Sequence, residues 1–462
     1  MTADRPRPAP VLRSRHRPGP APDRPVLARR RVLAAGAALP LATAGLAACG
    51  DGEDDGGGEE PDLSAELPRE EPGPAEGSGA LVSPFTARLL AALPRDAVNL
   101  VCSPLSAQIA LTMAGLGAAG ATRAQMEDVL GGSIDELAES ANTLASVLAA
   151  VGDAQREEAD DDAPEPARAS LVNGTWLQQG LEIEQAFLEG LAAHFGSGVY
   201  EVDFTDGAAR EEGRERINSW VEDATHGLVE DLVPEGSLTE DSRLMLVDAL
   251  HLKAAWSTAL GREGGSFTTA EGEELSVEML HGETSTWYED DLVRATSLEA
   301  YGDELALALV RPVADPAAVL EGWAGSAEDA GGGLAALLGG LEDSSATVEL
   351  AVPGFDIEWD EELTSPLTEL GMADAFSADA DFSGITASER LAITSVMHKA
   401  VITVDENGME AAAATAVGVG AVSAPVDVKE LVLDAPFLYV AYERSTLAPL
   451  VLGWIGDPTQ TR

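Results

Sequence analysis

The chain has 462 residues, of which 28 are Lys or Arg and 80 are Asp or Glu, so its formal net charge is −52. Such an acidic surface repels phosphate backbones and anionic headgroups, which excludes nucleic acids and heparin-like polyanions as partners. Hydrophobic residues make up 45% of the sequence, which is enough for a sizeable core and too many for an acidic disordered polymer.

The first 48 residues differ in charge from everything that follows them. They hold nine arginines and only two acidic residues, whereas the remaining 414 residues carry 19 basic and 78 acidic side chains, a net charge of −59. Residues 29–33 (RRRVL) resemble a twin-arginine export signal, and residues 32–48 form its apolar region. A transmembrane anchor is the alternative, but about 17 residues that include a proline are short for one.

The apolar run ends in Leu46, Ala47, Ala48 and Cys49, which resembles a bacterial lipobox. We therefore predict an export signal over residues 1–48 and a lipid on Cys49. The protein would be exported and either lipid-anchored to the outer face of the cell membrane or secreted, and it would touch the membrane only through the lipid. Lipidation leaves Cys102 alone, so no intramolecular disulfide can form.

Residues 49–80 are rich in Gly, Pro and acidic residues and have almost no large apolar side chains. This composition predicts an extended tether, although disordered filler fits equally well. One domain is then expected over residues 81–460, and nothing in it is long and apolar enough to span a bilayer.

Helix and strand patterns follow one another within residues 81–460 without regular alternation. Apolar spacing predicts helices near residues 85–93 and 106–113. Residues 153–166 form an acidic run that predicts a solvated loop. Several predicted strands are apolar on both faces, as a covered sheet requires. The predicted strands are residues 169–177, 243–252, 305–310, 347–352, 391–404 and 437–442.

Few residues suggest catalysis. The five histidines after the leader form no H-E-x-x-H pattern, and no G-x-S-x-G sequence occurs. Cys102 lies in an apolar stretch typical of a buried core thiol. Residues 115–120 match G-x-G-x-x-G, but a helical pattern precedes them where a dinucleotide site needs a strand. The glycosylation sequon at Asn173 is accidental in a bacterial-type lipoprotein. We predict no enzyme, no metal and no cofactor.

Residues 405–425 (DENGMEAAAATAVGVGAVSAP) are more informative. Helix propensity alone predicts a helix over residues 409–416, because alanine is the best helix former. A β-branched strand precedes the segment, however, and another strand follows it.

In this setting the sequence resembles the serpin family over residues 81–460. The matching motifs occur in family order, and no single one is decisive. They are N-x-x-x-S-P-x-S at 99–106, L-G-A-x-G-x-T at 116–122, Asn173 with Trp176, residues 217–227, residues 246–256, residues 352–355, 370–376, 381–385, 398–400, 436–437 and 452–453, and Pro458.

The resemblance implies a mixed α/β serpin fold with three β-sheets, about eight to nine helices and an exposed reactive-centre loop. Inhibitory serpins trap serine proteases: cleavage of the loop lets its first half insert as a new strand of the main sheet, with the protease still attached as an acyl complex. A monomer is expected. A non-inhibitory serpin that acts as a surface binding or structural lipoprotein is the alternative.

Family spacing from Glu406 places the reactive bond between Val422 and Ser423, with Ala421 or Ala424 as a secondary site. Valine suits a shallow apolar pocket, so the predicted target is an elastase-like or subtilisin-like protease. The hinge needs a flexible residue and then small side chains that can slide into a sheet. The predicted hinge residues are Glu406, Gly408, Met409, Glu410, Ala411, Ala412, Ala413 and Ala414.

The resemblance also assigns a strand-opening and breach region, made of Ser103, Ser106, Asn173, Asp248, Trp256 and His398. Three departures from the family follow. Met409 is long for its hinge position and is expected to slow insertion. Asp248 replaces the usual Asn, and a charged pair with His398 predicts pH-dependent stability. Residues 153–166 are expected to replace helix D, which disfavours polyanion activation. We find no basic partner for Glu406, because the chain has only three lysines.

Overall fold

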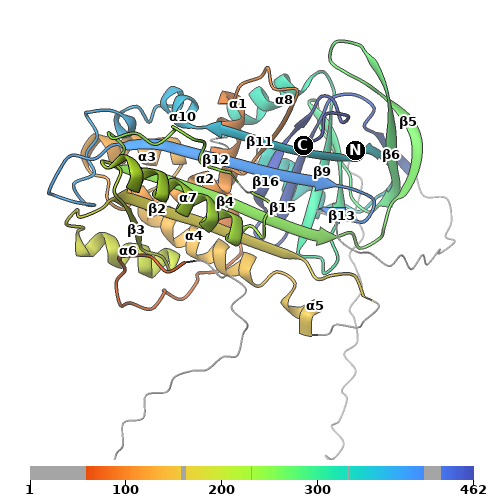
Figure 1. Cartoon of the computed structure of the whole chain (residues 1–462). Helices are drawn as coiled ribbons and strands as arrows, with labels where there is room; N and C mark the ends of the chain where they lie inside the picture. The colour runs from red at the N-terminus through yellow and green to blue at the C-terminus, as the bar shows by residue number, and fades with distance from the viewer. Residues whose placement is uncertain (1–58, 158–162, 230, 328, 330–331, 410–427) are drawn as a thin grey trace, which may run out of the picture. The chain divides into compact units, whose positions relative to one another are not determined.

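The computed structural model describes residues 59–462 except for positions 158–162, 230, 328, 330–331 and 410–427 (Figure 1). The described residues contain three sheets and nine α-helices of seven residues or more, in agreement with the predicted fold class. The nine helices are α1 (Val82–Ala92), α2 (Pro104–Gly115), α3 (Gly120–Leu130), α4 (Ile134–Ala149), α6 (Gln185–Phe195), α7 (Gly207–Ala224), α8 (Pro316–Gly325), α9 (Gly333–Glu342) and α10 (Thr364–Leu370). A shorter helix, α5 (Asp153–Glu157), has five residues.

The main sheet has six strands in the order β11-β12-β13-β4-β2-β3. Strand β12 runs parallel to β4, and β2 runs parallel to β3, whereas the other neighbours are antiparallel. The strands are β2 (Arg168–Gln178), β3 (Val199–Val202), β4 (Leu244–Ala255), β11 (Phe355–Glu362), β12 (Ile393–Val404) and β13 (Gly408–Met409).

A second sheet has the order β1-β16-β15-β9-β8-β7, and a third has the order β14-β10-β6-β5. The second sheet comprises β1 (Asn99–Cys102), β7 (Tyr288–Glu289), β8 (Val293–Glu299), β9 (Leu305–Pro312), β15 (Phe437–Glu443) and β16 (Ala448–Ile455). The third comprises β5 (Gly261–Thr268), β6 (Glu274–Thr284), β10 (Thr347–Pro353) and β14 (Val428–Val432).

The predicted strands are present, and several of them have sequences that are apolar on both faces. Every residue of β15 and β16 is buried, as expected for strands that are covered on both sides. On one face of the main sheet, α7 covers a separate apolar cluster that contains Trp176, Trp220 and Val247. Figure 1 shows α7 lying across β2 and β4.

The prediction that an acidic loop replaces the helix before β2 is wrong. The 16-residue helix α4 precedes β2, and Ser133 and Glu136 form a capping box at its start. The acidic run begins after this helix, and its first residues form the short helix α5. Asp135, Glu136 and Glu139 lie on α4, so the helix is still no site for a polyanion.

The predicted tether differs from the structure over its second half. Residues 59–77, which we name the strap, lie against the body of the protein. Leu63 pairs with Val199 of the edge strand β3. Arg216 of α7 forms ion pairs with Glu59 at 3.1 Å and Asp62 at 3.0 Å. Gly198 is needed here, because a Cβ at this position would lie 2.2 Å from the carbonyl oxygen of Leu63.

Within the described ranges, no helix combines the length and the apolar character that crossing a bilayer requires.

Candidate functional site

The chain turns sharply between β12 and β13, at residues 405–409, which we name the hinge. The Asp405 carboxylate accepts hydrogen bonds from the backbone N–H groups of Asn407 at 2.7 Å and Gly408 at 3.0 Å. This Asx turn reverses the chain, so that Met409 pairs with Val404. Trp256 holds the turn from the side, because its indole N–H donates to the Asp405 carbonyl at 2.9 Å.

The two residues of β13 fill the space between β12 and β4. Gly408 and Met409 pair with Ala255 and Ala254 of β4. Only glycine fits at position 408, because a Cβ there would lie 2.2 Å from the Ala254 carbonyl oxygen. The hinge glycine therefore serves close packing as well as backbone freedom.

Met409 is already inserted in this uncleaved chain. Its side chain is 1% exposed and belongs to the main hydrophobic core. We expected the long side chain of Met409 to slow insertion of the loop. Because Met409 already lies in the sheet before cleavage, its entry is not a step that follows cleavage. Methionine suits the position because its unbranched chain adapts to irregular gaps.

Glu406 has a basic partner that the sequence did not reveal. Its carboxylate forms an ion pair with Arg262 of β5, which also pairs with Glu278 at 2.8 Å. Burial raises the pKa of Glu406, but the hydrogen bond and the charge of Arg262, together with hydrogen bonds within the turn, lower it more in sum, so the pKa lies below its ordinary value. From the sequence we took only the lysines into account as partners, whereas the partner is an arginine on a strand of another sheet.

Strands β12 and β4 separate beyond one point of the main sheet. Their parallel pairing ends where His398 faces Asp248. From there to β13, residues 249–253 of β4 and 399–403 of β12 have no ladder partner toward each other among the described residues. On their other sides both stretches are paired, with β2 and β11. We name this interval the slot.

The closed end of the slot is a buried polar cluster that joins three elements. His398 Nδ1 and Asp248 Oδ1 are 2.9 Å apart, and both side chains are fully buried. The Ser103 backbone N–H donates to His398 Nε2 at 3.1 Å. The hydroxyls of Ser103 and Ser106, at the start of α2, are 2.9 Å apart. The structure thus brings four of the six predicted strand-opening residues together.

The other two lie apart from this hydrogen-bonded cluster. Asn173 faces Asp248 across β2 and β4, but Asn173 Oδ1 and Asp248 Oδ2 have no hydrogen-bond partner among the described residues. Trp256 lies at the opposite end of the slot, where it holds the hinge. The six residues predicted as one strand-opening region therefore come from both ends of the slot.

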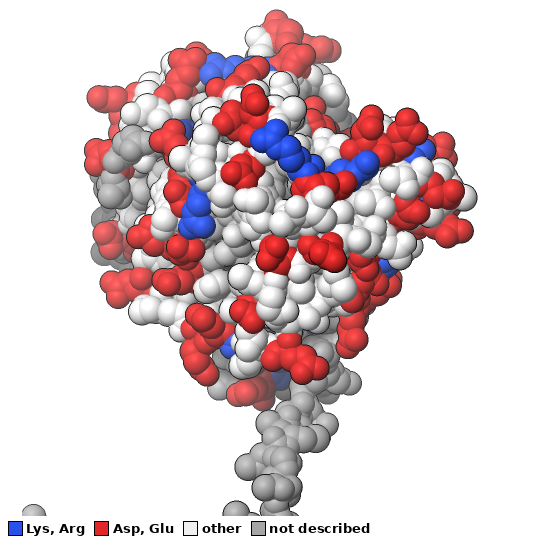
Figure 2. Space-filling view, turned by 90° about the vertical axis from the view of Figure 1, so that its left-hand side faces the viewer, with Lys and Arg blue, Asp and Glu red and all other residues white. Residues whose placement is uncertain are grey.

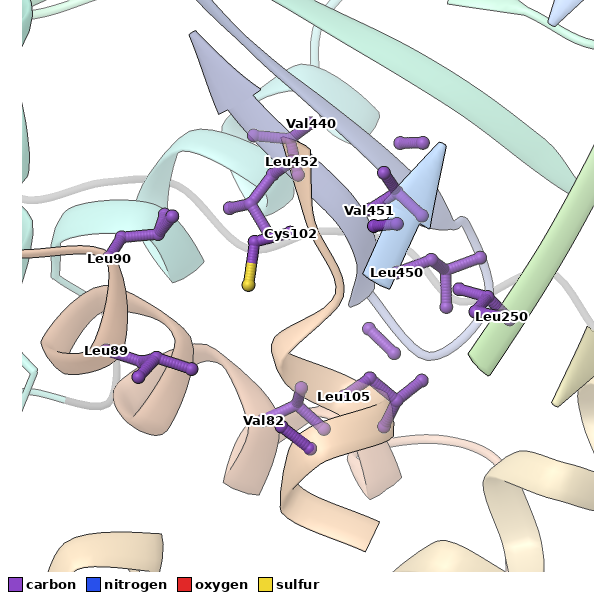
Figure 3. Close-up of a cluster of buried hydrophobic side chains, with 14 of the residues drawn as sticks. Val82, Leu89, Leu90, Cys102, Leu105, Leu250, Val440, Leu450, Val451 and Leu452 are labelled. Atoms are coloured by element: carbon purple, nitrogen blue, oxygen red, sulfur yellow. The ribbon is translucent and has the colours of Figure 1, made fainter. Parts of the chain in front are cut away.

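The protonation of His398 depends on its neighbours. Burial lowers the pKa of His398, but Cys102 and Asp248 raise it, and the result is about 10. The Ser103 N–H opposes this rise, because it donates to Nε2 and so requires the form with a single ring proton, on Nδ1. Cys102 itself is buried among Leu90, Val440 and Leu452, as predicted for a core thiol (Figure 3).

Several predicted residues lie outside the described part of the chain. They are the lipidation residue Cys49, the hinge residues Glu410, Ala411, Ala412, Ala413 and Ala414, and the reactive bond Val422 and Ser423.

Comparisons with known proteins agree with this geometry. The family model described as "Serpin (serine protease inhibitor)" matches residues 80–458. A serine protease inhibitor of Cyanea capillata is 30% identical over 79% of this chain and 94% of its own length. A serpin-like protein of Thermococcus kodakarensis is 33% identical over 82% of this chain and 85% of its own.

Solved structures give the same fold. The native thermophilic serpin tengpin covers 86% of this chain and 97% of its own at a TM-score of 0.73 and 24% identity. The native, stressed form of Arabidopsis AtSerpin1 covers 84% of this chain and all of its own, at a TM-score of 0.70 and 22% identity.

Proposed function

The chain belongs to the serpin family, and we propose that it inhibits a serine protease by suicide cleavage of the reactive-centre loop and insertion of that loop into the main sheet. Members of the family act as protease inhibitors or as non-inhibitory serpins and not as catalytic enzymes, so the chain is not an enzyme. The slot carries the proposal. Among the described residues, two strands of the main sheet lack ladder partners toward each other, and the chain that leads into the loop already begins to fill the space between them.

The free energy for insertion comes from completing the sheet. Each ladder hydrogen bond that a new strand forms contributes about 1 kcal/mol net, and the slot offers bonds on both of its sides. Buried backbone groups need such partners, because an unpaired one is costly. The native chain would then persist through a kinetic barrier, although a more stable inserted form exists.

The sequence that enters must fit two apolar surroundings. Leu250 and Ile402 of the slot strands belong to the main core, whereas Ala249 and Val401 contact the cluster beneath α7. A strand between β4 and β12 would meet both sides, so its side chains must be small. Four consecutive alanines, 411 to 414, satisfy this requirement on either face.

We propose Val422 and Ser423 as the reactive bond and an elastase-like or subtilisin-like enzyme as the target. No Lys or Arg lies between Asp405 and Val428, which disfavours trypsin-like proteases. We also propose export and a lipid anchor at Cys49. Only nine residues separate this cysteine from Glu59, the first residue of the strap. The lipid anchor would therefore be connected to the domain through the strap, which pairs with the edge strand β3.

Incubation with an elastase-type and a subtilisin-type protease, followed by an SDS gel, tests the inhibitory function. A covalent complex that survives SDS and a chain that becomes more heat-stable after cleavage are the expected results. Release of a cleaved chain alone, with no gain in thermal stability, would mean that trapping does not occur.

A non-inhibitory binding serpin is the second candidate, and a cavity of about 260 Å³ favours it. The cavity lies between α1, α8 and α9, with Trp323, Leu334 and Leu447 in its wall. It is smaller than the roughly 300–1,000 Å³ of most ligand pockets, so we place inhibition first. A calorimetric titration with small apolar ligands, compared between the native chain and Leu334→Trp, distinguishes this candidate.

A further inference from the structure

Three glutamates stand side by side on the outer face of the third sheet. Glu349 of β10 faces Glu430 of β14 on one side and Glu283 of β6 on the other. All three side chains are exposed. We name Glu283, Glu349 and Glu430 the acidic row.

The fold gives no reason for this arrangement. Like charges directly opposite each other on neighbouring strands destabilise a sheet. The ion pairs of the described residues include none with these three glutamates. The Lys and Arg residues of the same strands alternate to the other face, where Arg262 pairs with Glu278 and Lys429 lies 5.5 Å from the centre of the Trp287 ring. His281 of β6 lies on the face of the acidic row, opposite Ala351, and lines the hollow described below. Among the described residues, the acidic row therefore has no Lys or Arg counter-charge from its own sheet.

A hollow of about 360 Å³ adjoins the acidic row. Met279, Ala351 and Val432 line it with apolar side chains, and Glu349 and Glu430 also line it. Lysine and arginine side chains place an aliphatic stem on apolar surface and keep the charged end at a polar rim. The hollow and the acidic row together fit such a cationic side chain, which a plain acidic surface would not hold in place.

The position of the face points to its partner. Strand β14 begins at Val428, the fifth residue after Ser423 of the proposed reactive bond. Five residues span at most about 18 Å. A protease domain of about 230 residues is about 40 Å across, so an enzyme engaged at that bond reaches well beyond β14. It would therefore cover the acidic row and the hollow beside it.

We propose that the outer face of the third sheet is an exosite that binds a cationic surface segment of the target protease. The inference rests on the proposed inhibitory function and adds to it a second contact and a charge requirement for the enzyme. Charges at the rim of an interface act mainly on the association rate and on its dependence on salt. The exosite would thus select among proteases that accept the same valine.

The test measures the rate of covalent complex formation with two enzymes, a cationic elastase-type protease and a near-neutral subtilisin-type protease. The variant Glu283→Gln, Glu349→Gln, Glu430→Gln is compared with a control that loses three exposed glutamates of α7, Glu212→Gln, Glu215→Gln, Glu222→Gln. Both variants gain the same net charge. At low salt we expect the acidic-row variant to react about 10-fold more slowly with the cationic enzyme alone, with the difference disappearing at high salt.

Three results would overturn the proposal: an equal loss in the α7 control, an equal loss with the near-neutral enzyme, or no loss at all. The melting temperature of the acidic-row variant should not fall, since like charges are removed. If no covalent complex forms, inhibition fails as the function, and kcat/KM for cleavage of the loop replaces the association rate. A selective loss in kcat/KM still supports the exosite, whereas a loop that neither protease cleaves contradicts both proposals.

Discussion

The two ends of the slot, the closed end at His398 and the hinge end at β13, are held by different interactions. At one end, His398, Asp248 and Ser103 are buried and join β12, β4 and the start of α2 through hydrogen bonds. At the other end, two residues of β13 and the partly exposed pair of Glu406 and Arg262 hold the hinge. Buried polar networks open at a high cost, whereas exposed ion pairs contribute little. Strand insertion should therefore begin at the hinge and meet its main resistance at His398.

Among the substitutions that test the two ends of the slot, replacing Gly408 by alanine should change the stability of the hinge most. The added Cβ would lie 2.2 Å from the Ala254 carbonyl oxygen, so β13 cannot keep its place between β12 and β4. Losing its hydrogen bonds costs about 1–3 kcal/mol. Amide hydrogen exchange at Trp256, whose N–H donates to the Asn407 carbonyl, should accelerate more than 10-fold and report the release of the hinge.

Gly325→Ala is the matched control for this substitution. An added Cβ at position 325 would meet no atom within 4 Å, so exchange at Trp256 should not change. Unaltered exchange in Gly408→Ala as well would mean that the hinge does not depend on close packing at this glycine.

Much of this architecture could be predicted from sequence, and the parts that could not share a physical cause. Strands such as β4 and β15 are apolar on both faces, so their pattern identified them. The partner of Glu406 was missed because Arg262 belongs to a different sheet and is 144 positions away. The insertion of Met409 was also missed, since a two-residue strand carries no periodicity. Both depend on how distant segments meet in space.

The closed end of the slot should respond to pH. Burial lowers the pKa of His398 and the Ser103 N–H opposes its protonation, but Cys102 and Asp248 raise the pKa above its ordinary value of 6.5 in the folded chain. The stabilisation from the pair is therefore complete below pH 6.5 and is lost as pH rises from 6.5 toward 10. We expect the melting temperature to fall over this range. In Asp248→Asn the carboxylate that raises the pKa is absent, so the fall should be smaller. Equal slopes for the two proteins between pH 6.5 and 10 would rule out this role of the pair.

Removing the charge at the hinge should have the smallest effect. The side chains of Glu406 and Arg262 are 25% and 45% exposed, and exposed ion pairs contribute at most about 1 kcal/mol. Glu406→Gln should therefore lower the stability only slightly but increase exchange at Trp256 a few-fold. Glu278→Gln is the control, because it removes the other partner of Arg262 and leaves the hinge pair intact.

The pair at the hinge also predicts a pH dependence opposite to that of the closed end. The pKa of Glu406 is lowered in the folded chain, so its contribution is present above the ordinary value of 4.5 and is lost as pH falls below it. Acid should thus loosen the hinge while the pair of His398 and Asp248 still holds, and alkali should do the reverse. The exchange rate at Trp256, once corrected for the intrinsic pH dependence of amide exchange, should rise below pH 4.5 in the native chain but not in Glu406→Gln, and this would separate the two ends of the slot. A rise of the same size in both proteins would show that another group controls the hinge.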